Sequence, residues 1–150
     1  MTVSADIRPA TVNDAPAIAK ILSDWIDETD WMPRIHTREE DQGFGRFLIE
    51  KTDVVVAEVE GQVAGFLAQK ANSIEALYLA SDSRGQKIGS CLLTRAKKGS
   101  SELTLWTFQA NAAARAFYSA HGFVEVERTD GQGNDEKLPD VRCVWTRDNF

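Results

Sequence analysis

The 150-residue chain has the length of one compact domain, and we expect residues 1–150 to form a single domain. Hydrophobic residues make up 43% and charged residues 27%, a balance that excludes wholesale disorder. The formal net charge of -6 argues against nucleic acid as a partner, because an acidic surface repels phosphate backbones. No apolar run approaches the ~18 residues needed to cross a bilayer, and none resembles a secretory signal. We therefore expect a cytoplasmic protein with no membrane partner.

Metal and thiol chemistry find little support in the sequence. The two cysteines, Cys91 and Cys143, are too few for a disulfide scaffold and form no C-x-x-C pair. With only His36 and His121 beside them, no zinc-ligand spacing can be written. We expect no metal site, and we expect both thiols to be small buried hydrophobes.

The first half of the chain begins with a short predicted strand over residues 6–8. A helix over about 12–27 follows, because its apolar residues recur at helical spacing, and Thr11 with Asp14 resembles a capping box at its start. Thr37 with Glu40 predicts the start of a second helix, which runs to about residue 50. Two β-rich runs over 53–60 and 62–70, joined by a glycine turn, predict a hairpin, and a third strand is expected over 74–80.

The second half repeats the mixture of helices and strands. We expect a helix over 89–98, a strand over 103–108, an alanine-rich helix over 112–120 that ends at Gly122, and strands over 123–128 and 138–145. The order β-α-α-β-β-β-α-β-α-β-β indicates a mixed α+β or α/β fold with helices layered on a sheet.

The polar turn from Arg84 to Ser90, between a strand and a helix, carries the most informative pattern. Exposed N–H groups at a helix start attract anions, glycine lets the backbone approach a bulky anion, and Arg84 and Lys87 add positive charge. Neither a P-loop string, G-x-x-x-x-G-K-[ST], nor a dinucleotide fingerprint, G-x-G-x-x-G, occurs. By itself the turn fits either an anion site or a solvated loop.

Two segments together resemble the GNAT family of acetyltransferases. Residues 84–89 are similar to the family's [QR]-x-x-G-x-[GA] cofactor turn, except that Lys87 stands where the family usually has its middle glycine. Six residues match the family's N-x-x-A-x-x-F-Y-x-x-x-G-F segment in register: Asn111, Ala114, Phe117, Tyr118, Gly122 and Phe123. The resemblance covers about residues 5–130. It implies the GNAT acyl-CoA N-acyltransferase fold, a central mixed, mostly antiparallel sheet flanked by helices, with acetyl-CoA as the cofactor.

The resemblance also implies which residues hold the cofactor. The pyrophosphate is expected at the turn, on Arg84, Gly85, Gln86, Lys87, Ile88, Gly89 and Ser90. The pantetheine arm is expected along Leu77, Tyr78 and Leu79, like an added strand. Asn111 and Phe117 would contact the cofactor from the opposite side.

Acetyl transfer also needs groups that move protons. The resemblance implies that Tyr118 is the general acid, and a tyrosine hydroxyl with a pKa of about 10 stays protonated at neutral pH and can donate that proton. The alternative is a helix tyrosine packed on the sheet with its hydroxyl in solvent. Glu75 is a candidate general base or an ordinary exposed strand residue. His36 has a suitable pKa near 6.5 but lies in a loop of unknown placement.

The segment between the first two helices combines carboxylates with aromatic rings, which suits a cationic amine. Its substrate-binding candidates are Trp25, Glu28, Trp31 and His36, and the alternative is a solvated acidic helix face. We expect an N-acetyltransferase whose partners are acetyl-CoA and a primary amine of a small molecule or peptide; a homodimer is left open. The alternatives are a catalytically weak acyl-CoA sensor or interaction module, and a phosphate-ligand site unrelated to CoA.

Overall fold

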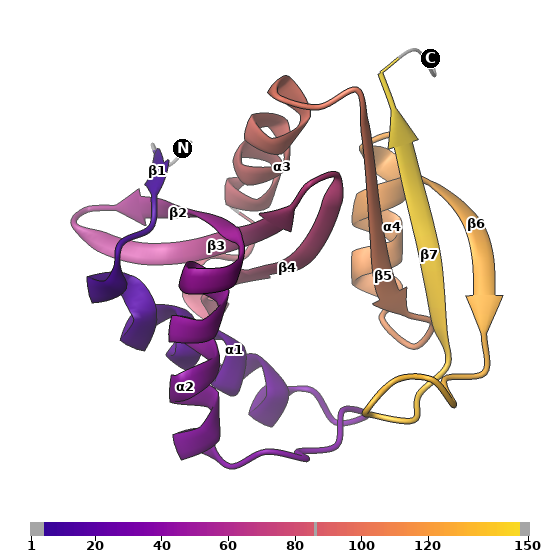
Figure 1. Ribbon diagram of the computed structural model, residues 1–150, viewed down its shortest axis with the longest axis horizontal. Helices are drawn as coiled ribbons and strands as arrows, with labels where there is room; N and C mark the ends of the chain where they lie inside the picture. The colour runs from indigo at the N-terminus through magenta and orange to yellow at the C-terminus, as the bar shows by residue number, and fades with distance from the viewer. Residues whose placement is uncertain (1–4, 86, 148–150) are drawn as a thin grey trace.

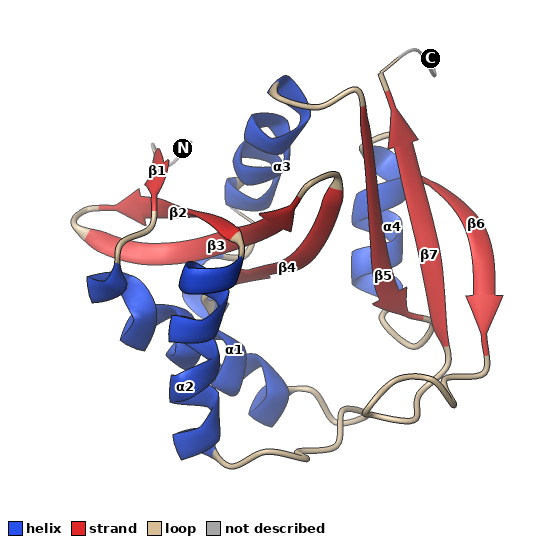
Figure 2. Ribbon diagram, in the orientation of Figure 1, coloured by secondary structure: helices blue, strands red, loops and turns tan. Residues whose placement is uncertain are grey.

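The computed structural model, which describes residues 5–85 and 87–147, contains a sheet in the order β1-β2-β3-β4-β5-β7-β6 (Figures 1 and 2). The strands are β1 (Asp6–Pro9), β2 (Asp53–Val59), β3 (Gln62–Lys70), β4 (Ser73–Leu79), β5 (Glu102–Phe108), β6 (Val124–Thr129) and β7 (Asp140–Thr146). The helices are α1 (Ala15–Glu28), α2 (Arg38–Lys51), α3 (Ile88–Lys98) and α4 (Ala112–Ala120). Every neighbouring pair of strands is antiparallel except β4 and β5. The predicted mixed, mostly antiparallel sheet flanked by helices is confirmed.

Two apolar cores cover the two faces of this sheet. One core joins α1 and α2 to β2 and β3 through Ile18, Leu48, Val56 and Phe66, all nearly inaccessible to solvent. The other packs α3 and α4 on the opposite face and includes Leu92. Successive residues of a strand point to opposite faces, so the run Val54 to Ala57 supplies both cores in turn. The two β-rich runs that the sequence analysis found over 53–60 and 62–70 are therefore strands that are buried on both sides.

The helix starts follow the sequence signals. The Thr37 hydroxyl accepts a hydrogen bond from the Glu40 N–H at 3.1 Å, and the Glu40 carboxylate accepts one from the Thr37 N–H at 2.9 Å. This reciprocal capping box starts α2. At the first helix, Asp14 accepts from the Thr11 N–H at 2.8 Å, and a single 3₁₀ turn (Val12–Asp14) precedes α1. None of the helices in the described ranges is long and apolar enough to cross a membrane.

The linker between α1 and α2 is held by one arginine. Arg34 donates from Nη1 to the Asp41 carboxylate at 2.7 Å, from Nε to Asp27 at 2.8 Å, and from Nη2 to both the carbonyl and the hydroxyl oxygen of Ser23 at 2.8 Å. Asp41 is only 4% exposed. Because a buried carboxylate is costly without a partner, this cluster fixes the position of the linker.

We expect Arg34→Ala to lower the free energy of unfolding by about 3 kcal/mol, because Asp41 would remain buried without its cation. Urea denaturation followed by circular dichroism measures the change. Arg38→Ala is the matched control, since Arg38 pairs with Asp24 and Asp27 at the exposed surface. Its loss should be much smaller. Equal losses in the two variants would contradict the special role of Arg34.

Candidate active site

A cleft opens in the middle of the sheet because the parallel pair β4–β5 is very short. Only Ser73–Ile74 pairs with Thr104–Leu105, and beyond these residues the two strands diverge (Figure 1). A cavity of about 80 Å³ lies between the diverging strands and is lined by residues of both, together with Trp25 and three residues of the α4 region, Asn111, Ala114 and Tyr118. Backbone groups on the facing edges of β4 and β5 are left without a strand partner there.

Glu75 enters this cleft at a β-bulge. Ala76 pairs with Ala68 and Ile74 pairs with Gln69, so Glu75 is the extra residue on β4. A bulge redirects side chains and is common beside active sites. Glu75 is exposed, and it lines both the cleft and a larger pocket described below. The structure therefore places this predicted general base at the junction of two cavities.

Tyr118 lies on α4 with its side chain in the cleft and only 8% exposed. Burial raises the pKa of its hydroxyl well above the ordinary value of about 10, and the nearby Tyr78 and Cys143 raise it further. Within the described residues the hydroxyl has no hydrogen-bond partner. Because the hydroxyl has no structural hydrogen bond and is not sealed from solvent, its proton is available to a molecule bound in the cleft.

Asn111 begins α4 and also lines the cleft. Its side-chain oxygen accepts a hydrogen bond from the Ala114 N–H at 3.1 Å, which caps the helix. Its Nδ2 group has no partner in the part of the chain that the structure describes. The sequence predicted Asn111 as a cofactor residue, and this geometry adds a second, structural task.

Phe117 packs α4 against the start of α3. A Cβ placed at Gly89 would lie 3.3 Å from the Phe117 ring, so glycine here permits close packing of the two helices. The His121 ring lies 4.4 Å from the Phe117 ring, and its Nδ1 lies 2.8 Å from the Phe117 carbonyl oxygen. In neutral imidazole, Nδ1 then donates and Nε2 accepts from the Ser90 hydroxyl at 2.9 Å. Ser90, a predicted cofactor residue, is thus tied to α4 through His121, which the sequence analysis did not connect to the site.

The turn before α3 has a backbone that explains its glycine preference. Gly85 and Lys87 both have positive φ, +82° and +65°, and Lys87 occupies the left-handed region immediately before the helix. Glycine enters that region at little cost, whereas a lysine is strained there. Ile88, which begins α3, is fully buried in the core, and Gln86 lies outside the described residues.

Arg84 is not a free cation. Its Nη1 lies 3.1 Å from the carboxylate of Glu28, at the end of α1. This pair joins Arg84, a predicted cofactor residue, to Glu28, which was predicted to bind substrate. Glu28 is not among the residues that line the larger pocket, and an ion pair accounts for its charge.

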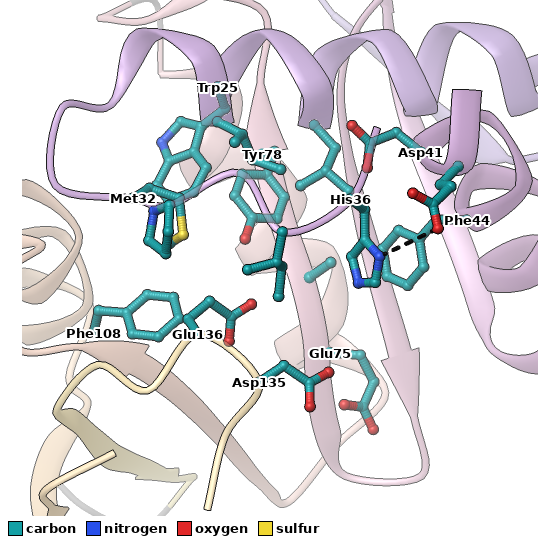
Figure 3. A pocket seen from close by; sticks show the side chains of 16 residues that line it. Trp25, Met32, His36, Asp41, Phe44, Glu75, Tyr78, Phe108, Asp135 and Glu136 are labelled. Atoms are coloured by element: carbon teal, nitrogen blue, oxygen red, sulfur yellow. Dashed lines mark ion pairs between the residues drawn. The ribbon is translucent and has the colours of Figure 1, made fainter. Parts of the chain in front are cut away.

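The larger pocket, of about 480 Å³, lies beside the cleft between β4, the α1–α2 linker and the loop that joins β6 to β7 (Figure 3). Trp25, Glu75, Ala76, Tyr78 and Phe108 line both cavities, so the two lie side by side and share a wall. We call this volume the acceptor pocket. Of the four residues predicted to bind substrate, Trp25 and His36 line it and Glu28 and Trp31 do not.

Aromatic rings form the inner wall of the acceptor pocket. Trp25 lies 5.1 Å from Tyr78, centroid to centroid, and Trp31 makes edge contacts with Trp25 at 5.9 Å and Phe108 at 5.8 Å. Trp31 therefore supports the wall from behind by linking α1 to β5. Burial, with the nearby charge of Glu136, raises the pKa of Tyr78 to about 12.

The lining residues that the sequence analysis did not single out include Phe108, Asp135 and Glu136. Phe108 ends β5, and the two acids lie in the β6–β7 loop. Because β7 inserts between β5 and β6, this loop returns to the end of β5. A polar loop between two strands gave no sign of that placement in the sequence.

The comparisons with known proteins agree with this geometry. The sequence model of the Acetyltransferase (GNAT) domain matches residues 50–125, about half of the chain. The chain belongs to the GNAT acetyltransferase family. An uncharacterized N-acetyltransferase from Archaeoglobus fulgidus is 28% identical over 119 residues, which cover 67% of this chain and 80% of that protein.

Solved GNAT structures share the whole fold. A GCN5-related N-acetyltransferase from Rhodopseudomonas palustris superposes with a TM-score of 0.81, covers 97% of this chain and 98% of its own, and is 24% identical. The yncA protein of Salmonella typhimurium, determined with its cofactor acetyl-CoA, gives a TM-score of 0.72 at 20% identity and covers 98% and 96%. GNAT acetyltransferases use acetyl-CoA, so the predicted family and cofactor are confirmed, and membership supports an acyltransferase.

The described residues fit this cofactor. The diverging edge of β4 offers unpaired backbone groups, Asn111 and Tyr118 offer unpartnered donors, and a Cβ at Gly85 would meet no atom within 4 Å. Lys87 adds an exposed cation beside the N-terminus of α3. The donor set and the open turn suit a ligand that combines phosphates with an amide-containing arm.

Substituting Lys87 separates its charge from its backbone strain. We expect Lys87→Gly to leave stability unchanged or raise it by up to about 1 kcal/mol, because glycine adopts positive φ without strain. Lys87→Met, the matched control, removes the charge and keeps the strain. Both variants should bind CoA about three- to tenfold more weakly at low salt and approach wild type at high salt. Urea denaturation and titration calorimetry measure the two effects, and wild-type affinity in both variants would place the phosphates elsewhere.

Proposed function

We propose that this protein transfers the acetyl group of acetyl-CoA to a primary amine of a small molecule or peptide. The observation that carries the proposal is Tyr118, a largely buried residue that lines the cleft beside the acceptor pocket and whose hydroxyl has no hydrogen-bond partner among the described residues. This arrangement supports a role at the point where two molecules meet.

When bound, acetyl-CoA supplies an acetyl group activated as a thioester. The backbone at the start of α3 and the Lys87 ammonium would hold its phosphates. The open edge of β4, from Glu75 onward, would pair with the amide groups of its pantetheine arm. Asn111 would donate from Nδ2, the group that helix capping leaves free. These contacts would place the thioester near Tyr118 and Glu75.

Glu75 and Tyr118 would move protons in opposite directions. An alkyl amine has a pKa of about 10.4, so it must lose a proton before its nitrogen can attack the carbonyl carbon. Glu75, exposed at the junction of cleft and pocket, can accept that proton directly or through a water. As the bond from carbon to sulfur breaks, the Tyr118 hydroxyl can donate its proton to the departing sulfur. Its raised pKa keeps this proton in place until then.

Turnover tests the proposal directly. We expect acetyl-CoA to raise the Tm, because a ligand that binds only the folded state stabilises it. We also expect free thiol to be released in the presence of primary amines. A panel of amines and peptide N-termini, read by thiol release, measures the reaction. A raised Tm without turnover on any acceptor would favour the acyl-CoA sensor instead, and no Tm shift at millimolar acetyl-CoA would count against the cofactor site.

Tyr118→Phe tests the proton donor. The substitution removes the hydroxyl and almost no volume, and it breaks no hydrogen bond within the described ranges, so Tm and CoA affinity should stay close to wild type. General acid catalysis typically contributes ~10²–10⁴-fold, and the single-turnover rate should fall by about that factor. A wild-type single-turnover rate would remove Tyr118 from the reaction and leave water or the amine as the proton source.

A further inference from the structure

We propose that the acceptor is an aliphatic diamine whose second, unreacting ammonium group binds at Asp135 and Glu136. The proposal rests on the proposed function, because it assumes that the acetylated nitrogen lies where the acceptor pocket meets the cleft. It adds the substrate class, and it gives the β6–β7 loop the task of recognising it.

The lining of the acceptor pocket carries charge of one sign. Its acidic residues are Glu40, Asp41, Glu75, Asp135 and Glu136, and its lining includes neither lysine nor arginine. Among the described residues of the lining, His36 alone can become positive, and its Nδ1 lies 3.7 Å from the Glu40 carboxylate. Figure 3 shows Glu75, Asp135 and Glu136 along one side of the pocket, facing Trp25, Tyr78 and His36 on the other.

Structural partners account for two of these five carboxylates. Asp41 accepts hydrogen bonds from Arg34 and Ser23, both at 2.7 Å. Glu40 accepts from the Thr37 N–H in the capping box of α2. Glu75, Asp135 and Glu136 have neither an ion pair nor a hydrogen bond within the ranges that the structure describes. Three carboxylates therefore face one cavity without a structural task.

The proposed reaction gives Glu75 a role, as the general base, and leaves Asp135 and Glu136 without one. The nitrogen that is acetylated must be neutral when it attacks, and Glu75 lies at the cleft, where that nitrogen loses its proton. Asp135 and Glu136 line the pocket and not the cleft. Carboxylates favour the charged form of an amine, so they would oppose the reaction at the attacking nitrogen itself. Their charge instead suits a second ammonium that stays protonated throughout.

The remaining walls suit the carbon chain and the charge of such a molecule. Met32, Pro33 and Ile35 from the linker and Phe108 from β5 offer apolar contact to methylene groups. Trp25 and Tyr78 offer ring faces, which attract ammonium groups. A pocket of about 480 Å³ is of the size that encloses small ligands.

The same lining disfavours acceptors that carry a carboxylate. Arg34, in the α1–α2 linker, uses its donors on Ser23, Asp27, Asp41 and the carbonyl oxygen of His36. An amino-acid substrate would bring a negative charge beside Asp135 and Glu136 without a cation to receive it. Amino acids are therefore expected to be poor acceptors.

Three acceptors with four carbon atoms each test the proposal with the full chain and saturating acetyl-CoA. They are 1,4-diaminobutane, butylamine and 4-aminobutanoate, which end in an ammonium, a methyl and a carboxylate group. We expect kcat/KM to be about tenfold higher for the diamine than for butylamine, through KM, and lowest for 4-aminobutanoate. The preference should shrink as salt is raised.

Variants of Asp135 and Glu136 test whether these residues cause the preference for the diamine. The double variant Asp135→Asn with Glu136→Gln should lower kcat/KM for the diamine to about the value for butylamine in the same variant, which abolishes the tenfold preference. Glu39→Gln is the matched control, because Glu39 is an exposed acid of α2 that does not line the pocket. It should keep the preference.

Different results overturn different claims. Equal kcat/KM for butylamine and the diamine, a preference that survives in the double variant, or 4-aminobutanoate as the best acceptor would overturn the diamine proposal and leave the acetyltransferase standing. Turnover of none of these amines and of nothing in the wider panel of amines and peptide N-termini would overturn the proposed function. In that case calorimetry of 1,4-diaminobutane with the CoA-loaded protein decides the inference: binding that is lost in the double variant supports it, and no binding overturns it.

Discussion

The structure depends on one short contact, the parallel pairing of β4 with β5 over two residues of each strand. A longer pairing would close the sheet and bury the strand edges, whereas no pairing would let its two halves separate. The short contact keeps seven strands in one sheet and still leaves the edges of β4 and β5 open beyond Ile74 and Leu105. Backbone groups need hydrogen-bond partners, so an open edge inside a fold is a natural place for an extended ligand. The cleft is thus a property of the backbone, and the side chains around it determine the chemistry.

Side chains from segments far apart in the sequence complete the site, because they pack across the gap between β4 and β5. Tyr78, Trp25, Trp31 and Phe108 form a continuous series of ring contacts from β4 through α1 and the linker to β5. On the other side of the sheet, Phe117 packs closely at Gly89, and His121 joins Ser90 to α4. The two halves of the sheet are therefore held together by aromatic packing on one face and by packing and hydrogen bonds on the other. Tyr118 and Glu75 lie between these two supports.

Local patterns predicted most of the fold, and they singled out the residues that are expected to hold the cofactor. The capping residues Thr37 and Glu40, the glycine turn of the β2–β3 hairpin and the motif from Asn111 to Phe123 act over a few residues, so the sequence alone reveals them. The acceptor side depends on contacts between segments far apart in the chain. The sequence predicts that Glu28 binds substrate, but in the structure Glu28 pairs with Arg84, 56 residues later. Asp135 and Glu136 enter the pocket only because β7 inserts between β5 and β6. Periodicity carries no information about such long-range neighbours.

The distribution of charge explains how an acidic protein can accommodate a polyanionic cofactor. Lys87, Arg95 and Lys98 line a single groove along α3, beside the turn where phosphates are expected. Three carboxylates without an ion pair or hydrogen bond among the described residues, Glu75, Asp135 and Glu136, lie on the acceptor side. Positive charge on the α3 side attracts the phosphates of the cofactor, and negative charge on the acceptor side attracts a cationic amine. Each side also repels the ligand that belongs to the other. Arg84, in the turn before α3, forms an ion pair with Glu28, at the end of α1. Pairing neutralises these two charges, which would otherwise weaken the separation of positive from negative charge across the cleft. The net charge of -6 is therefore less informative than the separation of the charges that remain unpaired.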